Sequence, residues 1–194
     1  AALRAAPNID NMLVVSRYQS ALGDKSGALA TMIDWIASHP DDLLARHALA
    51  AAYRVEKQVD AANEQYRKIL QIDDRNPAAL NNLAWSLRET EPRLALELAE
   101  KAANEDPLNA DILDTYAIIL LANQQTDKAS KMIQRALKQQ PNNPTFLYHQ
   151  AQVLHDKGQS TAAEKILIQV IATQPLFGEI DQAKRLLALI QGKK

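Results

Sequence analysis

The chain has 194 residues, a formal net charge of −1 and 47% hydrophobic residues, which is enough apolar material for a sizeable core. The near-neutral charge argues against a nucleic-acid binder, because such proteins carry basic surface that neutralises phosphates. The sequence contains no cysteine, which excludes disulfides and thiolate metal sites. No apolar run approaches the roughly 20 residues that a membrane helix needs.

Amphipathic stretches that end in proline recur at a fixed interval. Before the first of them, AALRAAPN reads as the end of a helix, so we expect residues 1–8 to close an upstream repeat of a longer protein. Pro107, Pro141 and Pro175 lie 34 residues apart, and Pro40 precedes Pro107 by 67 residues. This spacing predicts five repeats, at 9–42, 43–76, 77–109, 110–143 and 144–177, the third being one residue short.

Two positions of the repeat hold only small residues, the eighth and the twentieth. They are Ser16, Ala50, Ala84, Ala117 and Ala151, and Ala28, Ala62, Ala95, Ala129 and Ala163. Because residues three and four apart share a helical face, each repeat is predicted to be two antiparallel helices that approach closely at these side chains. Neighbouring pairs then stack, since neither pair can bury its apolar face alone.

Turn residues mark the ends of the predicted helices. Gly23 and Gly158 are expected as C-cap residues, and Pro92 fits a first helical turn. Polar residues at the starts of second helices are predicted to accept hydrogen bonds from free amides: Ser26, Asp60, Thr126 and Ser160. Trp35, at the usually small twenty-seventh position, is predicted to be packed core. Residues 178–194 are predicted as a capping helix and tail.

The pattern resembles the tetratricopeptide repeat family over residues 9–177. The resemblance implies an all-α fold, a right-handed α-solenoid of five helix-turn-helix repeats plus a C-terminal capping helix. It also implies a scaffold that binds other proteins rather than an enzyme.

A narrower resemblance rests on ALNNLAWSLRETEPRLALELAEKA, ILDTYAIILL and PTFLYHQAQVLHDKG. These segments are similar to the C-terminal repeats of the tetratricopeptide lipoproteins that accompany exosortase (PEP-CTERM) protein sorting and exopolysaccharide production. The chain departs from that group at Tyr116–Ala117–Ile118, where a glycine and a tryptophan are common, and the group's lipidated N-terminal cysteine is not in this sequence. The resemblance implies a location on the periplasmic side of a bacterial membrane, with the cytoplasm as the alternative.

Motifs for catalysis, cofactors and metals are missing from the sequence. There is no GxSxG elbow, no Walker A or GxGxxG loop, and no HExxH pair among the four histidines. The HPDD segment at 39–42 falls in a predicted turn, where Pro40 and Asp42 act as helix stop and start signals. We therefore predict no catalytic residue, no metal and no cofactor.

The fifth, ninth and twelfth positions of each repeat form a stripe on the first helices, which line the groove in a tetratricopeptide solenoid. From this stripe we predict eleven partner-binding residues: Arg17, His47, Arg54, Asn81, Trp85, Arg88, Asp114, Ile118, Tyr148, Gln152 and His155. Arginine pairs with carboxylates through several donors, and tryptophan and tyrosine offer flat apolar faces with a polar tip.

Three functions follow in order of preference. The first is a scaffold that docks a protein or peptide segment in the groove. The second is a glycan-binding groove, in which Trp85 and Tyr148 stack on sugars while Asn81 and His47 bond hydroxyls. The third is an enzyme, which no residue pattern supports. We expect no nucleic-acid partner, no membrane contact by this chain, and self-association where an end of the repeat stack is bare.

Overall fold

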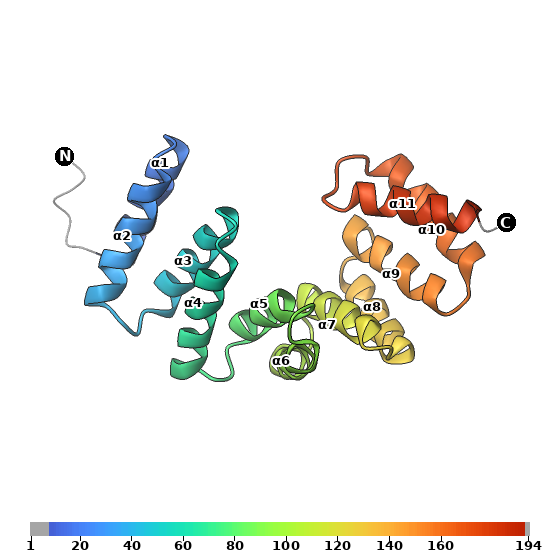
Figure 1. The fold of residues 1–194 in the computed structure, drawn as a ribbon, viewed down its shortest axis with the longest axis horizontal. Coiled ribbons are helices and arrows are strands. Elements are labelled where there is room, and N and C mark those ends of the chain that lie inside the picture. Colours follow the sequence, from blue (N-terminus) through green and yellow to red (C-terminus); the bar gives the residue numbers. More distant parts are fainter. Residues whose placement is uncertain (1–7, 193–194) are drawn as a thin grey trace. The chain divides into compact units, whose positions relative to one another are not determined.

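The computed structural model describes residues 8–192, and within that range the chain is entirely helical (Figure 1). Eleven helices follow one another and no strand occurs among these residues, so the predicted all-α class is confirmed. The helices are α1 (Ile9–Ala21), α2 (Lys25–Ser38), α3 (Leu43–Val55), α4 (Val59–Ile72), α5 (Pro77–Leu87), α6 (Pro92–Glu105), α7 (Ala110–Ala122), α8 (Thr126–Gln139), α9 (Pro144–Asp156), α10 (Ser160–Thr173) and α11 (Ile180–Gly192).

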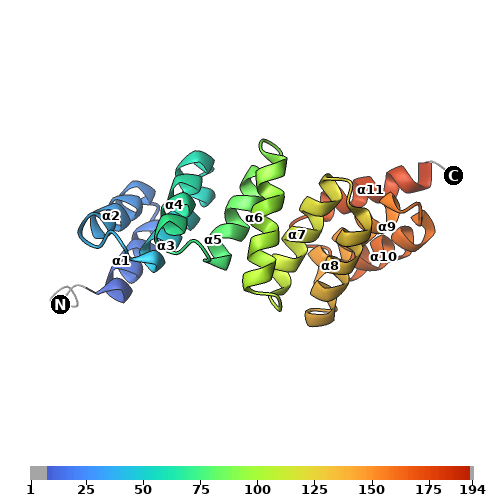
Figure 2. The same cartoon turned by 90° about the horizontal axis from the view of Figure 1, so that it is seen from below.

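The helices belong to two compact units, an N-terminal unit that ends at Leu83 and a C-terminal unit that begins at Ala84, within α5. In the N-terminal unit each helix from α1 to α4 packs against the next, and α1 also contacts α3. In the C-terminal unit the same sequential packing runs from α6 to α11, and α7 also contacts α9 (Figure 2). Sequential packing of helix pairs is the arrangement predicted from the repeats.

The small residues of the eighth and twentieth positions are buried at every repeat. Nine of them are alanines no more than 2% exposed, and Ser16 is 3% exposed. A larger side chain at any of these places would hold two helices apart, because protein interiors have no spare volume. Their burial agrees with the prediction that the helices pack closely at these residues.

Each unit has a core built from consecutive helices. In the N-terminal unit Met12, Met32, Ala45 and Leu49 form one cluster, with Trp35 packed partly buried against it. In the C-terminal unit a cluster of Tyr148, Ala151, Ala163, Leu167, Ala183 and Ile190 joins α9, α10 and α11.

Trp35 lies at the edge of its core rather than within it. Its indole Nε1 donates to the Asp42 carboxylate at 2.8 Å, and its ring stacks on His39 with centroids 4.0 Å apart. Asp42 also caps α3 by accepting from the Ala45 amide. The HPDD turn thus serves helix termination and capping, as predicted, and no cluster able to hold a metal ion occurs among residues 8–192.

The first helix of each predicted repeat begins with a side-chain cap that the sequence analysis did not single out, apart from Asp42. The capping residues are Asn8, Asp42, Asn76, Asn109 and Asn143, whose side-chain oxygens accept from amides two or three residues ahead. Their spacing of 34, 34, 33 and 34 residues repeats the period of the prolines. An Asn or Asp at this place satisfies an amide that the first helical turn otherwise leaves unpaired.

The predicted caps of the second helices are wrong. Ser26, Asp60, Thr126 and Ser160 lie inside α2, α4, α8 and α10, and the N-cap residues are Asp24, Gln58, Gln125 and Gln159. Only Asp24 makes a side-chain cap, because a glutamine side chain is too long to turn back on its own helix. Pro92 occupies the first turn of α6, as predicted.

The turn between the two helices of a pair uses a left-handed residue. Gly23 and Gly158 have φ of 85° and 75°, which fits their predicted C-cap role. Lys57 and Gln124 take the same place in the second and fourth predicted repeats, each with φ of 59°. A side chain in this conformation costs conformational energy that glycine avoids.

Three parts of the predicted domain plan stay predictions. The helix expected in 1–8 lies outside the described residues except for Asn8, which caps α1. The boundaries of the five repeats also stay predictions and are used below only to number equivalent positions. At the C-terminus α11 packs on α10 and buries Ala183 and Ile190.

No helix among residues 8–192 has the length and apolar character needed to cross a bilayer.

Candidate partner-binding surface

The predicted stripe lies on α1, α3, α5, α7 and α9, with Arg88 one residue beyond the end of α5. In the N-terminal unit the stripe residues differ in their burial and in the hydrogen bonds that they make. Arg17 is exposed. Arg54 is exposed too, and its Nη1 donates to the Asn82 side chain at 3.2 Å.

His47 and Asn81 are half-buried members of the stripe. His47 Nε2 lies 3.1 Å from Oδ1 of Asn76, the residue that caps α5. Burial lowers the pKa of His47, and the hydrogen bond with Asn76 offsets part of that effect. The Asn81 side-chain oxygen is buried and accepts no hydrogen bond from the described residues.

Trp85 and Arg88 form a fixed stack at the start of the C-terminal unit. The guanidinium carbon of Arg88 lies 4.0 Å from the centroid of the Trp85 ring. Its Nη1 donates to the Trp85 carbonyl at 2.7 Å, and its Nη2 donates to the Glu89 carboxylate at 2.9 Å. Both side chains are half-buried. The arrangement holds an aromatic ring and a planar cation in one orientation, so little rotamer entropy remains to be lost on binding.

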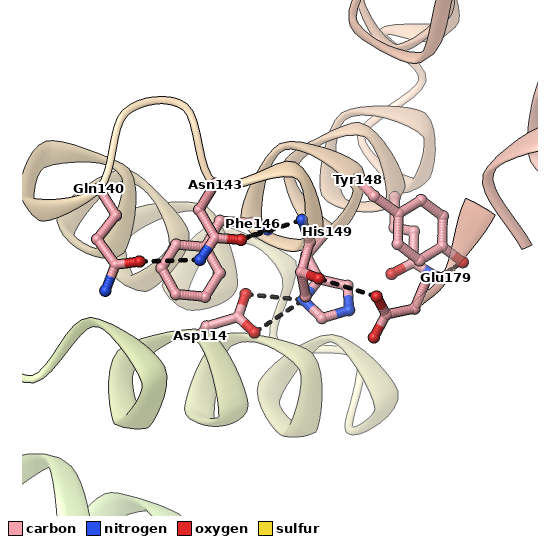
Figure 3. Close-up of polar contacts among 9 residues, drawn as sticks. Asp114, Gln140, Asn143, Phe146, Tyr148, His149 and Glu179 are labelled. Carbon is pink, nitrogen blue, oxygen red and sulfur yellow. Dashed lines mark hydrogen bonds and ion pairs between the residues drawn. The ribbon is translucent and has the colours of Figure 1, made fainter. Parts of the chain in front are cut away.

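Asp114 is buried in the C-terminal unit, where it pairs with a histidine that the stripe does not include. Its carboxylate reaches from α7 toward His149 on α9, whose Nδ1 lies 2.7 Å and 2.9 Å from the two oxygens (Figure 3). Asp114 is 6% exposed and His149 5%. Burial raises the pKa of Asp114, and the hydrogen bond from His149 pulls it back in part. The pair therefore links two first helices inside the core.

Glu179, in the segment before α11, closes the same cluster (Figure 3). It accepts a hydrogen bond from the Thr145 hydroxyl of α9 at 2.8 Å. Its charge also contributes to the raised pKa of Asp114. Asp114, His149 and Glu179 thus bring α7, α9 and the entry to α11 together.

Tyr148 is also part of the core, at 6% exposure. Its ring packs near Phe177, with centroids 6.4 Å apart, and its hydroxyl accepts from Gln152 Nε2 at 2.9 Å. Burial chiefly, and then the charge of Glu179, raise the pKa of Tyr148. The ring therefore cannot stack freely on a ligand unless the segment carrying Phe177 moves.

The remaining stripe residues of this unit, Ile118, Gln152 and His155, are half-buried. His155 Nδ1 lies 3.1 Å from the Ser160 hydroxyl. Together with Trp85 and Arg88 they form the accessible part of the C-terminal stripe, a set that combines apolar area, an amide, an imidazole and a guanidinium. Such a set combines the apolar area and the hydrogen-bonding groups that are typical of protein interfaces.

His149 is the residue that sequence reasoning missed. Asp114 is at the fifth position of the fourth predicted repeat, and His149 is at the sixth position of the fifth. A separation of one repeat plus one residue is the only signal in the sequence, and it has meaning only once the repeat numbering is known. The structure thus defines a helical-repeat scaffold with a stripe that is partly accessible and partly committed to the core.

Comparison with known proteins agrees with this class. Residues 86–152 match a family model described as tetratricopeptide repeat. The chain is 24% identical over 129 residues to the type IV pilus assembly protein PilF of Pseudomonas aeruginosa, covering 65% of this chain and 51% of PilF. It is 25% identical over 138 residues to cellulose synthase 1 operon protein C of Komagataeibacter xylinus, covering 70% of this chain and 10% of that protein.

Among solved structures, PilW, described as a widely conserved type IV pilus biogenesis factor, matches with a TM-score of 0.75. The identity is 21%, and the match covers 97% of this chain and 93% of PilW. The chain spans about half the length of one curated relative and a tenth of the other. Residues 86–152 are thus similar to the tetratricopeptide repeat family, and the likeness to PilW shows a shared helical-repeat fold.

Proposed function

We propose that this protein docks a segment of a partner protein along the stripe of its first helices, as a scaffold in bacterial exopolysaccharide assembly or export and in PEP-CTERM protein sorting. The Trp85–Arg88 stack carries the proposal. A half-buried indole and guanidinium, fixed by contacts of 4.0 Å and 2.7 Å, have the composition of an interface hot spot.

The cellular setting is supported by two observations. The segments between Ala79 and Gly158 resemble lipoproteins of the exosortase systems, and one relative is encoded by a cellulose synthase operon. We therefore propose a location on the periplasmic side of a bacterial membrane, as the resemblance to those lipoproteins implies.

The test measures the affinity of a peptide selected by phage display on the whole chain. Trp85→Ala and Arg88→Ala should each weaken binding about tenfold or more, in the range of hot-spot residues. The matched control is Tyr18→Ala, which removes an aromatic ring that is 67% exposed on α1 and lies off the stripe. An affinity that Trp85→Ala and Arg88→Ala leave unchanged contradicts the proposal, as does an equal loss with the control.

A second candidate is a glycan-binding stripe, favoured by the part of the half-buried Trp85 ring that stays exposed. The chain has two tryptophans. In a Trp35→Phe background the remaining fluorescence therefore reports Trp85 alone. Titration with cello-oligosaccharides and with acidic oligosaccharides should quench or shift this signal. A flat response up to millimolar sugar removes this candidate and leaves the protein-docking proposal intact.

A further inference from the structure

The outer helix α8 has a basic face. Lys128, Lys131, Arg135 and Lys138 follow one another at intervals of three, four and three residues, so they lie on one side of the helix. All four side chains are exposed, while the opposite side of α8 is buried in the core. The helix holds a single acidic residue, Asp127, which Lys157 pairs at 2.7 Å. Lys157 chiefly, and Lys131 to a smaller degree, lower the pKa of Asp127.

The repeat itself does not require these cations. The same four positions carry mostly neutral or acidic residues in the other second helices: Gly27, Ala30, Asp34 and Ala37 in α2; Ala61, Glu64, Lys68 and Gln71 in α4; Leu94, Glu97, Lys101 and Asn104 in α6; Ala162, Lys165, Gln169 and Ala172 in α10. Arg135 has a structural role as well, since its Nη2 donates to the Pro107 carbonyl at 2.8 Å. Among residues 8–192 no ion pair engages Lys128, Lys131 or Lys138.

The face is narrow and has a defined end. At 1.5 Å per residue the line of cations is about 15 Å long. At the N-terminal end of α8 it meets a shallow hollow of about 450 Å³. Its wall holds two lysines, two glutamines, a threonine and two aspartates: Lys128, Lys157, Gln124, Gln125, Thr126, Asp127 and Asp156. The corresponding side of α6 carries the exposed carboxylates Glu97 and Glu100 and a single cation, Lys101. A flat anionic surface would meet repulsion there, whereas a linear polyanion along α8 alone would not.

We propose that this α8 basic face binds an acidic segment of a partner protein, at a site separate from the first-helix stripe. Carboxylates three and four residues apart on a helix, or successive in an acidic run, match the spacing of the lysines. The glutamine amides at the hollow both donate and accept, which suits peptide groups. A protein partner also agrees with the interaction-scaffold fold.

The probe is a fluorescein-labelled poly-glutamate peptide, and its fluorescence anisotropy is measured with the whole chain over a salt series. The triple variant Lys128→Gln, Lys131→Gln, Lys138→Gln keeps Arg135 and its bond to Pro107. The matched control Lys57→Gln, Lys165→Gln, Lys184→Gln removes the same charge from lysines that are exposed elsewhere. Glutamine at position 57 is compatible with its φ of 59°, because Gln124 adopts that conformation in α8's own repeat.

We expect the face variant to bind poly-glutamate about tenfold more weakly than the wild type and the control to change by less than about twofold. Wild-type affinity should fall as salt rises. Absence of binding, or an equal loss in both variants, overturns the proposal. The proposal is also overturned if alginate or phosphatidylserine vesicles bind the wild type better than the face variant while poly-glutamate does not bind. The partner would then be a polysaccharide or a membrane.

Discussion

The buried Asp114–His149 pair makes the C-terminal unit sensitive to single substitutions. Asp114→Ala leaves the His149 Nδ1 donor without an acceptor at a place that is 5% exposed. His149→Ala leaves a carboxylate buried without its donor. Removing one partner of a buried pair costs about 3–5 kcal/mol, a large share of the roughly 5–15 kcal/mol that stabilises a folded domain. Each single variant should therefore unfold at much lower denaturant than the wild type.

The measurement is urea unfolding followed by helical circular dichroism, combined with hydrogen exchange to locate the loss. Exchange should accelerate first in α9 and α11, because Asp114, His149 and Glu179 join these elements to α7. In a double-mutant cycle the Asp114→Ala, His149→Ala variant should cost clearly less than the sum of the singles. Replacing the pair by Leu and Phe should recover most of the stability, since apolar residues of similar volume need no partner.

The matched control is Asp111→Ala, which removes an exposed carboxylate from the first turn of the same helix α7. Its cost should stay below about 1 kcal/mol. Single variants at Asp114 and His149 that unfold within about 0.5 kcal/mol of this control would refute the reasoning, and so would a coupling energy near zero.

Three further outcomes follow from local geometry. Lys57→Gly should stabilise the chain by up to about 1 kcal/mol in thermal unfolding, because φ is 59° there, whereas Lys57→Ala should bring no gain. Asn109→Ala should destabilise by about 1 kcal/mol in urea unfolding, by removing the cap of α7. Burial lowers the pKa of His47, so as the pH falls below 6.5 the unfolded chain binds a proton that the folded chain does not. The free energy of unfolding should therefore decrease as the pH falls through this range. His47→Gln should make the urea midpoint depend less on pH.

Periodic features of this protein could be predicted from the sequence because each recurs at every repeat. The alanines at the eighth and twentieth positions are such a feature, and all are buried. The Asn and Asp caps of the first helices have the same period and are therefore predictable from the sequence as well. A Ser or Thr near a helix start does not by itself identify the cap, because the geometry of the preceding turn sets which residue begins the helix: Thr126 and Ser160 are the first residues of α8 and α10.

Features that occur once could not be predicted in the same way. The family's stripe placed Asp114 and Tyr148 among the partner-binding residues, but both are buried. Asp114 is engaged by His149, and Tyr148 packs near Phe177 from the segment before α11. The surroundings of Asp114 depend on His149, which lies off the stripe positions, and those of Tyr148 depend on Phe177, which lies outside the five stripe helices. Periodicity carries no information about such a residue.

This division between periodic and single features determines how binding experiments on the stripe must be designed. A substitution of Asp114 or Tyr148 would lower partner affinity through the folded population alone, because both side chains hold α9 in place. Loss of binding in such a variant is therefore no evidence for a contact. Trp85 and Arg88 differ from these two residues. Their stack is half-buried, and the hydrogen bonds of Arg88 go to Trp85 and Glu89, which lie within α5 or directly after it. At these two residues we expect a loss of affinity larger than the fall in folded population can explain, and that excess distinguishes a binding surface from a packing defect.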